Sequence, residues 1–158
     1  MKQKGFTFVE IIIAIGIMSV LGAIIFAGFN NYRQVQTLQT SGDEVATMLN
    51  LARSRAQSQI KPSVCTDNLN GYRVVITAPK TYALKVSYSG TIDDIGDIEI
   101  SEQIKQLPAN VTFSNNSSFF FLVRTGETIP DGGGTIAVNY AGKTKTITIN
   151  ALGGVSVQ

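Results

Sequence analysis

The sequence predicts an α+β fold, in which a long N-terminal helix packs on a C-terminal antiparallel β domain. Three observations predict it. Residues 6–29 are apolar except for one glutamate, and residues 30–61 carry apolar side chains at helical spacing. Residues 62–158 instead contain short segments of alternating apolar and polar side chains, separated by turn signals. The helix is therefore expected to have a transmembrane half and an amphipathic half.

The apolar segment, residues 6–29, is long enough to cross a membrane. As a helix it would extend about 36 Å, against a bilayer core of about 30 Å. Glu10 is its only charged residue. A carboxylate costs about 3 kcal/mol near the centre of a bilayer and less toward its edge. Glu10 therefore needs either a partner or a position where water reaches it.

Two lysines, Lys2 and Lys4, precede this segment, and the positive-inside rule keeps them in the cytoplasm. A cleaved secretory signal also begins with cations, but its apolar core usually has only about 7 to 15 residues. A plain transmembrane anchor is the stronger alternative. We expect a single-pass protein of the cytoplasmic (inner) membrane, with its N-terminus in the cytoplasm and residues 30–158 outside.

The amphipathic helix, residues 30–61, presents one apolar stripe. The stripe consists of Tyr32, Val35, Leu38, Val45, Leu49, Ala52, Ala56 and Ile60. Gly42 interrupts it at a cost of about 1 kcal/mol relative to alanine. Ser41 and Glu44 have the spacing of a capping box, so a bend or break is expected near Gly42. Pro62 ends the helix, because it bars the preceding residue from helical geometry.

Alternation marks the expected strands of the β domain. The alternating apolar sets are Tyr72, Val74 and Ile76; Tyr82, Leu84, Val86 and Tyr88; Ile136, Val138 and Tyr140; and Ile147 and Ile149. Turn signals predict hairpins at Asn70-Gly71, Ala78-Pro79-Lys80, Ser89-Gly90, 130–134, Ala141-Gly142-Lys143 and Gly153-Gly154. Residues 102–106 are the exception, where a helical turn or two is expected. Residues 118–124, SFFFLVR, predict a central strand, with the helix on one face and a second sheet or a neighbouring subunit on the other.

Composition excludes several classes of function. The chain has no histidine and one cysteine, Cys65, which rules out a histidine-based triad, a histidine metal site and an intrachain disulfide. The formal charge of +2 equals the contribution of Lys2 and Lys4, so the rest of the chain is neutral and offers nucleic acid little general attraction. We expect no enzymatic activity and no cofactor.

One acidic stretch, residues 91–102, offers a weak candidate for calcium binding. Its possible oxygen ligands are Asp93, Asp94, Asp97 and Glu99. The spacing is not that of an EF-hand, and a solvated loop is the competing interpretation.

The N-terminal junction resembles the class III leader of type IV pilins and type II secretion pseudopilins. The resemblance rests on Lys4-Gly5, followed by Phe6-Thr7-Phe8-Val9-Glu10 and a wholly apolar stretch. It implies that residues 1–5 are a leader, that a prepilin peptidase cuts between Gly5 and Phe6, and that Phe6 becomes N-methylated. It also implies that Glu10 neutralises the N-terminal amine of a neighbouring subunit during assembly. The alternative is a hydrated carboxylate at headgroup level.

The rest of the chain resembles minor pseudopilins of the GspH/FimT type. The helix end LNLARSRA, residues 49–56, is similar to theirs, as are the following Val64-Cys65 and a glycine-centred turn after Ile147-Thr148-Ile149. The resemblance implies a pilin-like fold and a place in a type II secretion pseudopilus or a type IV pilus. The implied partners are the prepilin peptidase, other pilin or pseudopilin subunits, an inner-membrane assembly platform and the membrane.

Some FimT-like minor pilins bind DNA through arginines of the C-terminal turn. Here that region reads NALGGVSVQ, residues 150–158, without a cation. The remaining candidates, Arg124, Lys143 and Lys145, are also typical of solvated strand edges. We therefore expect a minor filament subunit that does not bind nucleic acid. A DNA-capturing minor pilin of a competence pilus and an isolated membrane-anchored binding domain are the alternatives.

Overall fold

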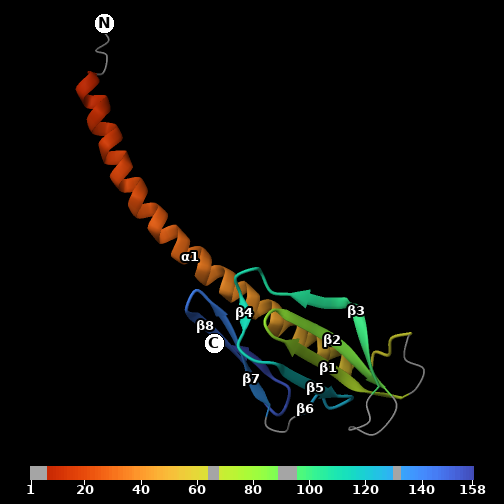
Figure 1. The fold of residues 1–158 in the computed structure, drawn as a ribbon. Coiled ribbons are helices and arrows are strands. Elements are labelled where there is room, and N and C mark those ends of the chain that lie inside the picture. The colour runs from red at the N-terminus through yellow and green to blue at the C-terminus, as the bar shows by residue number, and fades with distance from the viewer. Residues whose placement is uncertain (1–6, 64–67, 89–95, 130–132) are drawn as a thin grey trace, which may run out of the picture. The chain divides into compact units, whose positions relative to one another are not determined.

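The computed structural model describes residues 7–63, 68–88, 96–129 and 133–158. Within them, one long helix is followed by antiparallel strands (Figure 1), so the expected α+β fold is confirmed. The elements are α1 (Phe8–Gln57), β1 (Leu69–Thr77), β2 (Thr81–Tyr88), β3 (Gly96–Gln106), β4 (Thr112–Phe113), β5 (Ser117–Leu122), β6 (Thr128–Ile129), β7 (Gly134–Tyr140), β8 (Lys143–Ile149) and β9 (Val155–Val157). The chain forms two compact units, which divide between Gln36 and Thr37.

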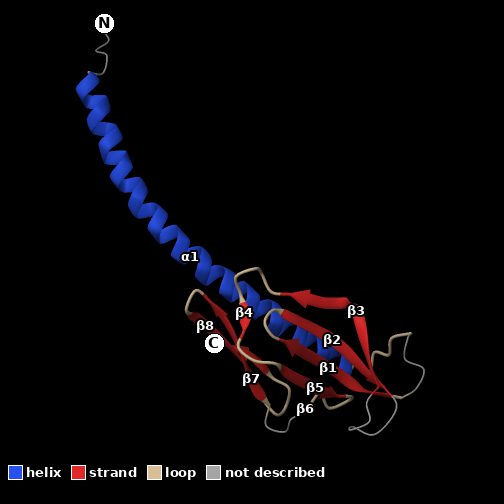
Figure 2. Ribbon diagram, in the orientation of Figure 1, coloured by secondary structure: helices blue, strands red, loops and turns tan. Residues whose placement is uncertain are grey.

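The strands of the second unit form two antiparallel sheets (Figure 2). One sheet has the order β3-β2-β1-β5-β6, and the other has the order β4-β7-β8-β9. The β7–β8 hairpin turns at Ala141 and Gly142, as the sequence predicts. Both residues have positive φ, 50° and 77°, which is the backbone pattern whose twist matches that of the flanking strands.

The helix residues from Leu38 to Ala56 supply one side of the core. Five members of the predicted stripe are buried, namely Leu38, Val45, Leu49, Ala52 and Ala56. They pack in one cluster with residues of both sheets, among them Tyr72, Val74, Phe121 and Ile147. The stripe is thus confirmed over this range. Its outer members, Tyr32, Val35 and Ile60, are exposed because the first two precede the second unit and the third follows the helix end.

Of the bend or break expected near Gly42, the break is wrong, because α1 continues through it. Ser41 does not cap a new helix; its Oγ donates to the carbonyl oxygen of Thr37 at 2.8 Å. A Cβ at Gly42 would lie 3.3 Å from Cγ of Lys145 and 3.5 Å from Cγ1 of Val157. The helix therefore lies close to β8 and β9 at Gly42.

The helix ends at Gln57, before Pro62 requires it to. The backbone N–H of Arg124 donates to the carbonyl oxygen of Ala56 at 3.1 Å, and so satisfies one of the free carbonyls of the last turn. Gln59 then adopts a φ of 52°, the left-handed conformation in which helices commonly terminate. Contact with the β5–β6 turn, and not the proline, accompanies the end of the helix.

Two further local predictions are wrong. Asn70 and Gly71 lie in β1, where the pairing with β2 shifts register between Leu69 and Gly71. A Cβ at Gly71 would lie 2.2 Å from the carbonyl oxygen of Phe121, so this glycine serves the close approach of β5 instead of a turn. Residues 102–106 belong to β3, which pairs with β2, and form no helical turn.

The expectation that β5 is buried on both faces is confirmed. Phe119, Phe120 and Phe121 are all buried. Phe119 and Phe121 join the core on the side of the helix, whereas Phe120 pairs with Arg73 of β1 and has that guanidinium 5.5 Å from its ring centroid. Among the described residues, Arg73 thus covers part of the second face of β5.

Candidate functional site

The helix begins with a reciprocal pair of hydrogen bonds between Thr7 and Glu10. The backbone N–H and the Oγ1 of Thr7 both donate to Oε2 of Glu10 at 2.8 Å, and the backbone N–H of Glu10 donates to Oγ1 of Thr7 at 3.3 Å. This is a capping box, in which the side chains satisfy backbone donors that the first turn leaves free. The carboxylate also lies at the positive end of the helix dipole.

The part that Thr7 plays was not among the predictions from the sequence. The signal is present as the spacing T-x-x-E directly before an apolar run, which is the pattern of a helix start. Within the subunit, Glu10 thus has a partner that sequence analysis did not assign to it. Its side chain is exposed in the first turn of α1.

The residues of the expected cleavage site, Gly5 and Phe6, lie outside the described residues.

The calcium candidate is also largely outside the described part of the chain. Asp93 and Asp94 are not described, while the backbone of Asp97 and Glu99 lies in β3. Among the described residues, no group of three or more histidine, cysteine, aspartate or glutamate side chains is placed to hold a metal ion. Cys65 likewise lies outside the described residues.

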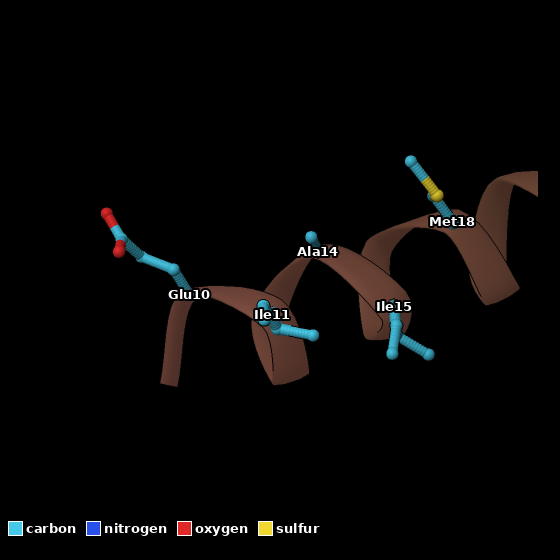
Figure 3. Close-up of a pocket in the computed structure, with 5 residues that line it drawn as sticks. All are labelled: Glu10, Ile11, Ala14, Ile15 and Met18. Carbon is cyan, nitrogen blue, oxygen red and sulfur yellow. The ribbon is translucent and has the colours of Figure 1, made fainter. Parts of the chain in front are cut away.

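A shallow groove of about 350 Å³ runs along α1 from Glu10 (Figure 3). Figure 3 shows Glu10, Ala14 and Met18 along one side and Ile11 and Ile15 along the other. Each row follows the i to i+4 spacing of the helix, and the small Ala14 lowers the first row between two longer side chains. Grooves between such rows accept a ridge of side chains from another helix. This one is apolar apart from the carboxylate at its N-terminal end.

The described side chains of residues 8–21 are all exposed. α1 is the one helix in the described chain that is long and apolar enough to cross a membrane, with a mean hydropathy of 2.6 in its most apolar window. Ser19, a polar residue within this stretch, donates its hydroxyl to the carbonyl oxygen of Ile15 at 2.8 Å. That hydroxyl therefore needs no water in an apolar environment.

The three candidate cations for a nucleic-acid surface do not form one cluster. Arg124 lies in the turn after β5, with its N–H bonded to the carbonyl oxygen of Ala56, whereas Lys145 packs its Cγ near Gly42. Ala56 and Gly42 are 14 residues, or roughly 21 Å, apart along α1. Arg124 therefore does not lie beside Lys145, because β8 meets the helix far from its C-terminal end.

Comparison with known proteins identifies the N-terminal segment. Residues 1–26 match the family described as the prokaryotic N-terminal methylation motif. No curated protein and no solved structure matches the chain. The motif supports a type IV pilin or pseudopilin that a prepilin peptidase processes, and with the apolar helix it is consistent with a single-pass membrane anchor. Residues 1–26 therefore carry a type IV pilin-like prepilin signal.

Proposed function

We propose that the chain is a minor pilin or pseudopilin, which a prepilin peptidase cuts between Gly5 and Phe6 and methylates at Phe6. The observation that carries this proposal is the methylation motif at residues 1–26, which runs directly into an exposed apolar helix. The helix anchors the subunit in the cytoplasmic membrane, with its N-terminus in the cytoplasm and the β domain outside. An inner-membrane assembly platform then transfers it into a type II secretion pseudopilus or a type IV pilus. Its role is structural and not enzymatic.

Assembly would exchange the partners of Glu10. In the single subunit the carboxylate accepts hydrogen bonds from Thr7, which requires no second chain. In a filament, the groove that begins at Glu10 would receive a neighbouring helix, and the carboxylate would face the N-terminal amine of that neighbour. The ion pair adds a charge-assisted interaction that an uncharged side chain cannot supply.

We propose that the subunit is of the GspH/FimT kind, and two features of the second unit support this. The segment LNLARSRA forms the last turns of α1 and buries Ala52 and Ala56 against the sheets. The glycine-centred turn is well ordered by hydrogen bonds, with the N–H of Asn150 donating to the carbonyl of Gly154 at 2.9 Å and the N–H of Gly154 donating to Oδ1 of Asn150 at 2.6 Å. Both features are among those on which the resemblance rests.

Processing provides the direct test. When the chain is produced together with a prepilin peptidase, intact-mass analysis should show loss of residues 1–5 and addition of one methyl group. Gly5→Leu should block the cut, because a glycine leaves the backbone open to close approach and a large side chain does not. Gly22→Leu is the matched control, since Gly22 has open space around it and lies away from the junction. An N-terminus that stays at Met1 with the peptidase present, or that forms near Gly28, would contradict the proposal.

DNA capture is the competing function, and we expect the chain to bind duplex DNA only weakly. The body is neutral, and Arg124 and Lys145 lie far apart, so few counterions would be released on binding. Titration of the purified chain in detergent at low and moderate salt measures this directly. Micromolar or tighter affinity with a steep salt dependence, lost on replacing Arg124, Lys143 and Lys145 with glutamine, would favour the competence-pilus alternative instead.

A further inference from the structure

The apolar part of α1 ends in a cluster of two aromatic side chains and a cation, formed by Phe29, Tyr32 and Arg33. Phe29 is 54% exposed and Tyr32 is 63% exposed. Positions three and four residues apart share one face of a helix, so the three side chains lie together. Cζ of Arg33 is 5.7 Å from the ring centroid of Phe29, within the range of a cation–π interaction. Among the described residues, the Arg33 guanidinium has no ion pair or hydrogen bond, so its N–H donors are left for an external acceptor.

Charge is absent from the helix between Glu10 and Arg33. The two residues are 23 positions apart, which corresponds to a rise of roughly 34 Å along α1. This slightly exceeds the thickness of the bilayer core, about 30 Å. One charged side chain can therefore lie in each headgroup layer while every residue between them crosses hydrocarbon.

We propose that Phe29, Tyr32 and Arg33 form an interfacial collar that binds lipid phosphate at the membrane face opposite the N-terminus and sets the insertion depth of α1. Guanidinium groups form paired hydrogen bonds with phosphate oxygens, and aromatic rings concentrate at headgroup level. The contact with Phe29 holds the Arg33 side chain beside the helix, where the headgroups would surround it. Binding of a protein partner would not require Glu10 and Arg33 to be separated by the thickness of a bilayer, whereas binding of lipid phosphate at the opposite membrane face does.

The collar has a consequence for Glu10 in the unassembled subunit. With Arg33 at one headgroup layer, Glu10 lies at the opposite layer, where water and the Thr7 hydrogen bonds both reach its carboxylate. The cost of placing a charge at the bilayer centre is then avoided before assembly. This inference rests on the proposed membrane span, and its test is designed to separate the two.

The chain contains no tryptophan, so a single introduced tryptophan reports its own depth. Met18 lies inside the span, roughly 12 Å along the helix from Glu10. Its side chain is 71% exposed, so Met18→Trp should disturb little. The full chain with this substitution is reconstituted into phosphatidylcholine vesicles that carry bromine at shallow or deep acyl positions. With the collar intact, the deep bromines should quench the fluorescence most strongly.

Removing the collar cation should then shift the helix. In the Met18→Trp protein, Arg33→Gln is expected to move the tryptophan toward the headgroups by about one helical turn, or about 5 Å. Arg33→Lys should restore most of the original depth, because an ammonium also binds phosphate. Arg124→Gln is the matched control, since it removes an exposed arginine from the β domain and should leave the depth unchanged.

Two results would overturn the proposal in different ways. If neither set of bromines quenches Met18→Trp, the span itself is wrong, and the proposed function fails with it. If the deep bromines quench it strongly but Arg33→Gln leaves the depth unchanged, the span stands and the collar is refuted.

Discussion

Glu10→Ala is expected to abolish incorporation of the subunit into filaments, while leaving its abundance and its processing at Gly5 unchanged. Removing one partner of a buried ion pair typically costs about 3 to 5 kcal/mol, which corresponds to more than a hundredfold in an association constant. The single subunit should lose much less. It forfeits only its capping box, worth about 1 kcal/mol at the helix start, and its apolar segment becomes easier to insert.

The measurement is site-specific crosslinking between neighbouring N-terminal helices, in cells that carry the cognate assembly machine. Glu10→Gln should behave like Glu10→Ala, and Glu10→Asp should be intermediate because it keeps the charge but shortens its reach. Thr7→Ala is the matched control, since it removes the hydroxyl from the capping box and retains the carboxylate. Loss of crosslinks in Thr7→Ala as complete as in Glu10→Ala would assign the effect to the helix cap. Glu10→Ala crosslinks at the unaltered level would show that the carboxylate takes no part in assembly.

Gly71→Ala should destabilise the β domain by about 3 kcal/mol or more, one of the larger effects expected of a single methyl group. The added Cβ would lie 2.2 Å from the carbonyl oxygen of Phe121 and 2.7 Å from Cζ of Phe120. The first of these is a backbone atom of the neighbouring strand β5, so rotation of a side chain cannot relieve the clash. β1 and β5 would have to separate where Gly71 pairs with Leu122.

Urea unfolding of the full chain in detergent, followed by the β-sheet signal in circular dichroism, measures this loss. Gly22→Ala is the matched control, because a Cβ there meets nothing within 4 Å. It should leave the unfolding midpoint of the β domain unchanged. A midpoint for Gly71→Ala equal to that of the unaltered protein would mean that β1 and β5 do not approach this closely.

Side-chain periodicity predicted the fold because it reports burial directly. The apolar stripe from Leu38 to Ala56 has helical spacing, and its members are buried as expected. Similarly, Tyr72, Val74 and Ile76 alternate along the chain and lie in the core. Glycine was the less reliable signal. Gly42 suggested a break and Gly71 suggested a turn. Each glycine instead lies close to a residue far away in the chain, Lys145 and Phe121 respectively. Local sequence does not contain those contacts.

In the candidate site, too, local features could be predicted from the sequence and long-range contacts could not. The T-x-x-E spacing at Thr7 is local and therefore predictable, because the hydrogen bonds that it forms span only three residues. The separation of Arg124 from Lys145 depends on where two distant turns meet the helix, and the sequence carries no simple signal for it. The partner of Glu10 in a filament would come from another chain, so the pattern of one chain can suggest it only by resemblance.

The capping box at the start of α1 also bears on what maturation can change. Both of its residues, Thr7 and Glu10, follow the expected cut after Gly5, so the mature chain keeps every residue that forms these helix-starting hydrogen bonds. Cleavage would remove the two lysines of the leader and create a single new amine at Phe6. The helix should therefore start at the same residue in both forms. Cleavage would change the charge of the N-terminus, from a strongly cationic end to one positive charge, without refolding the anchor.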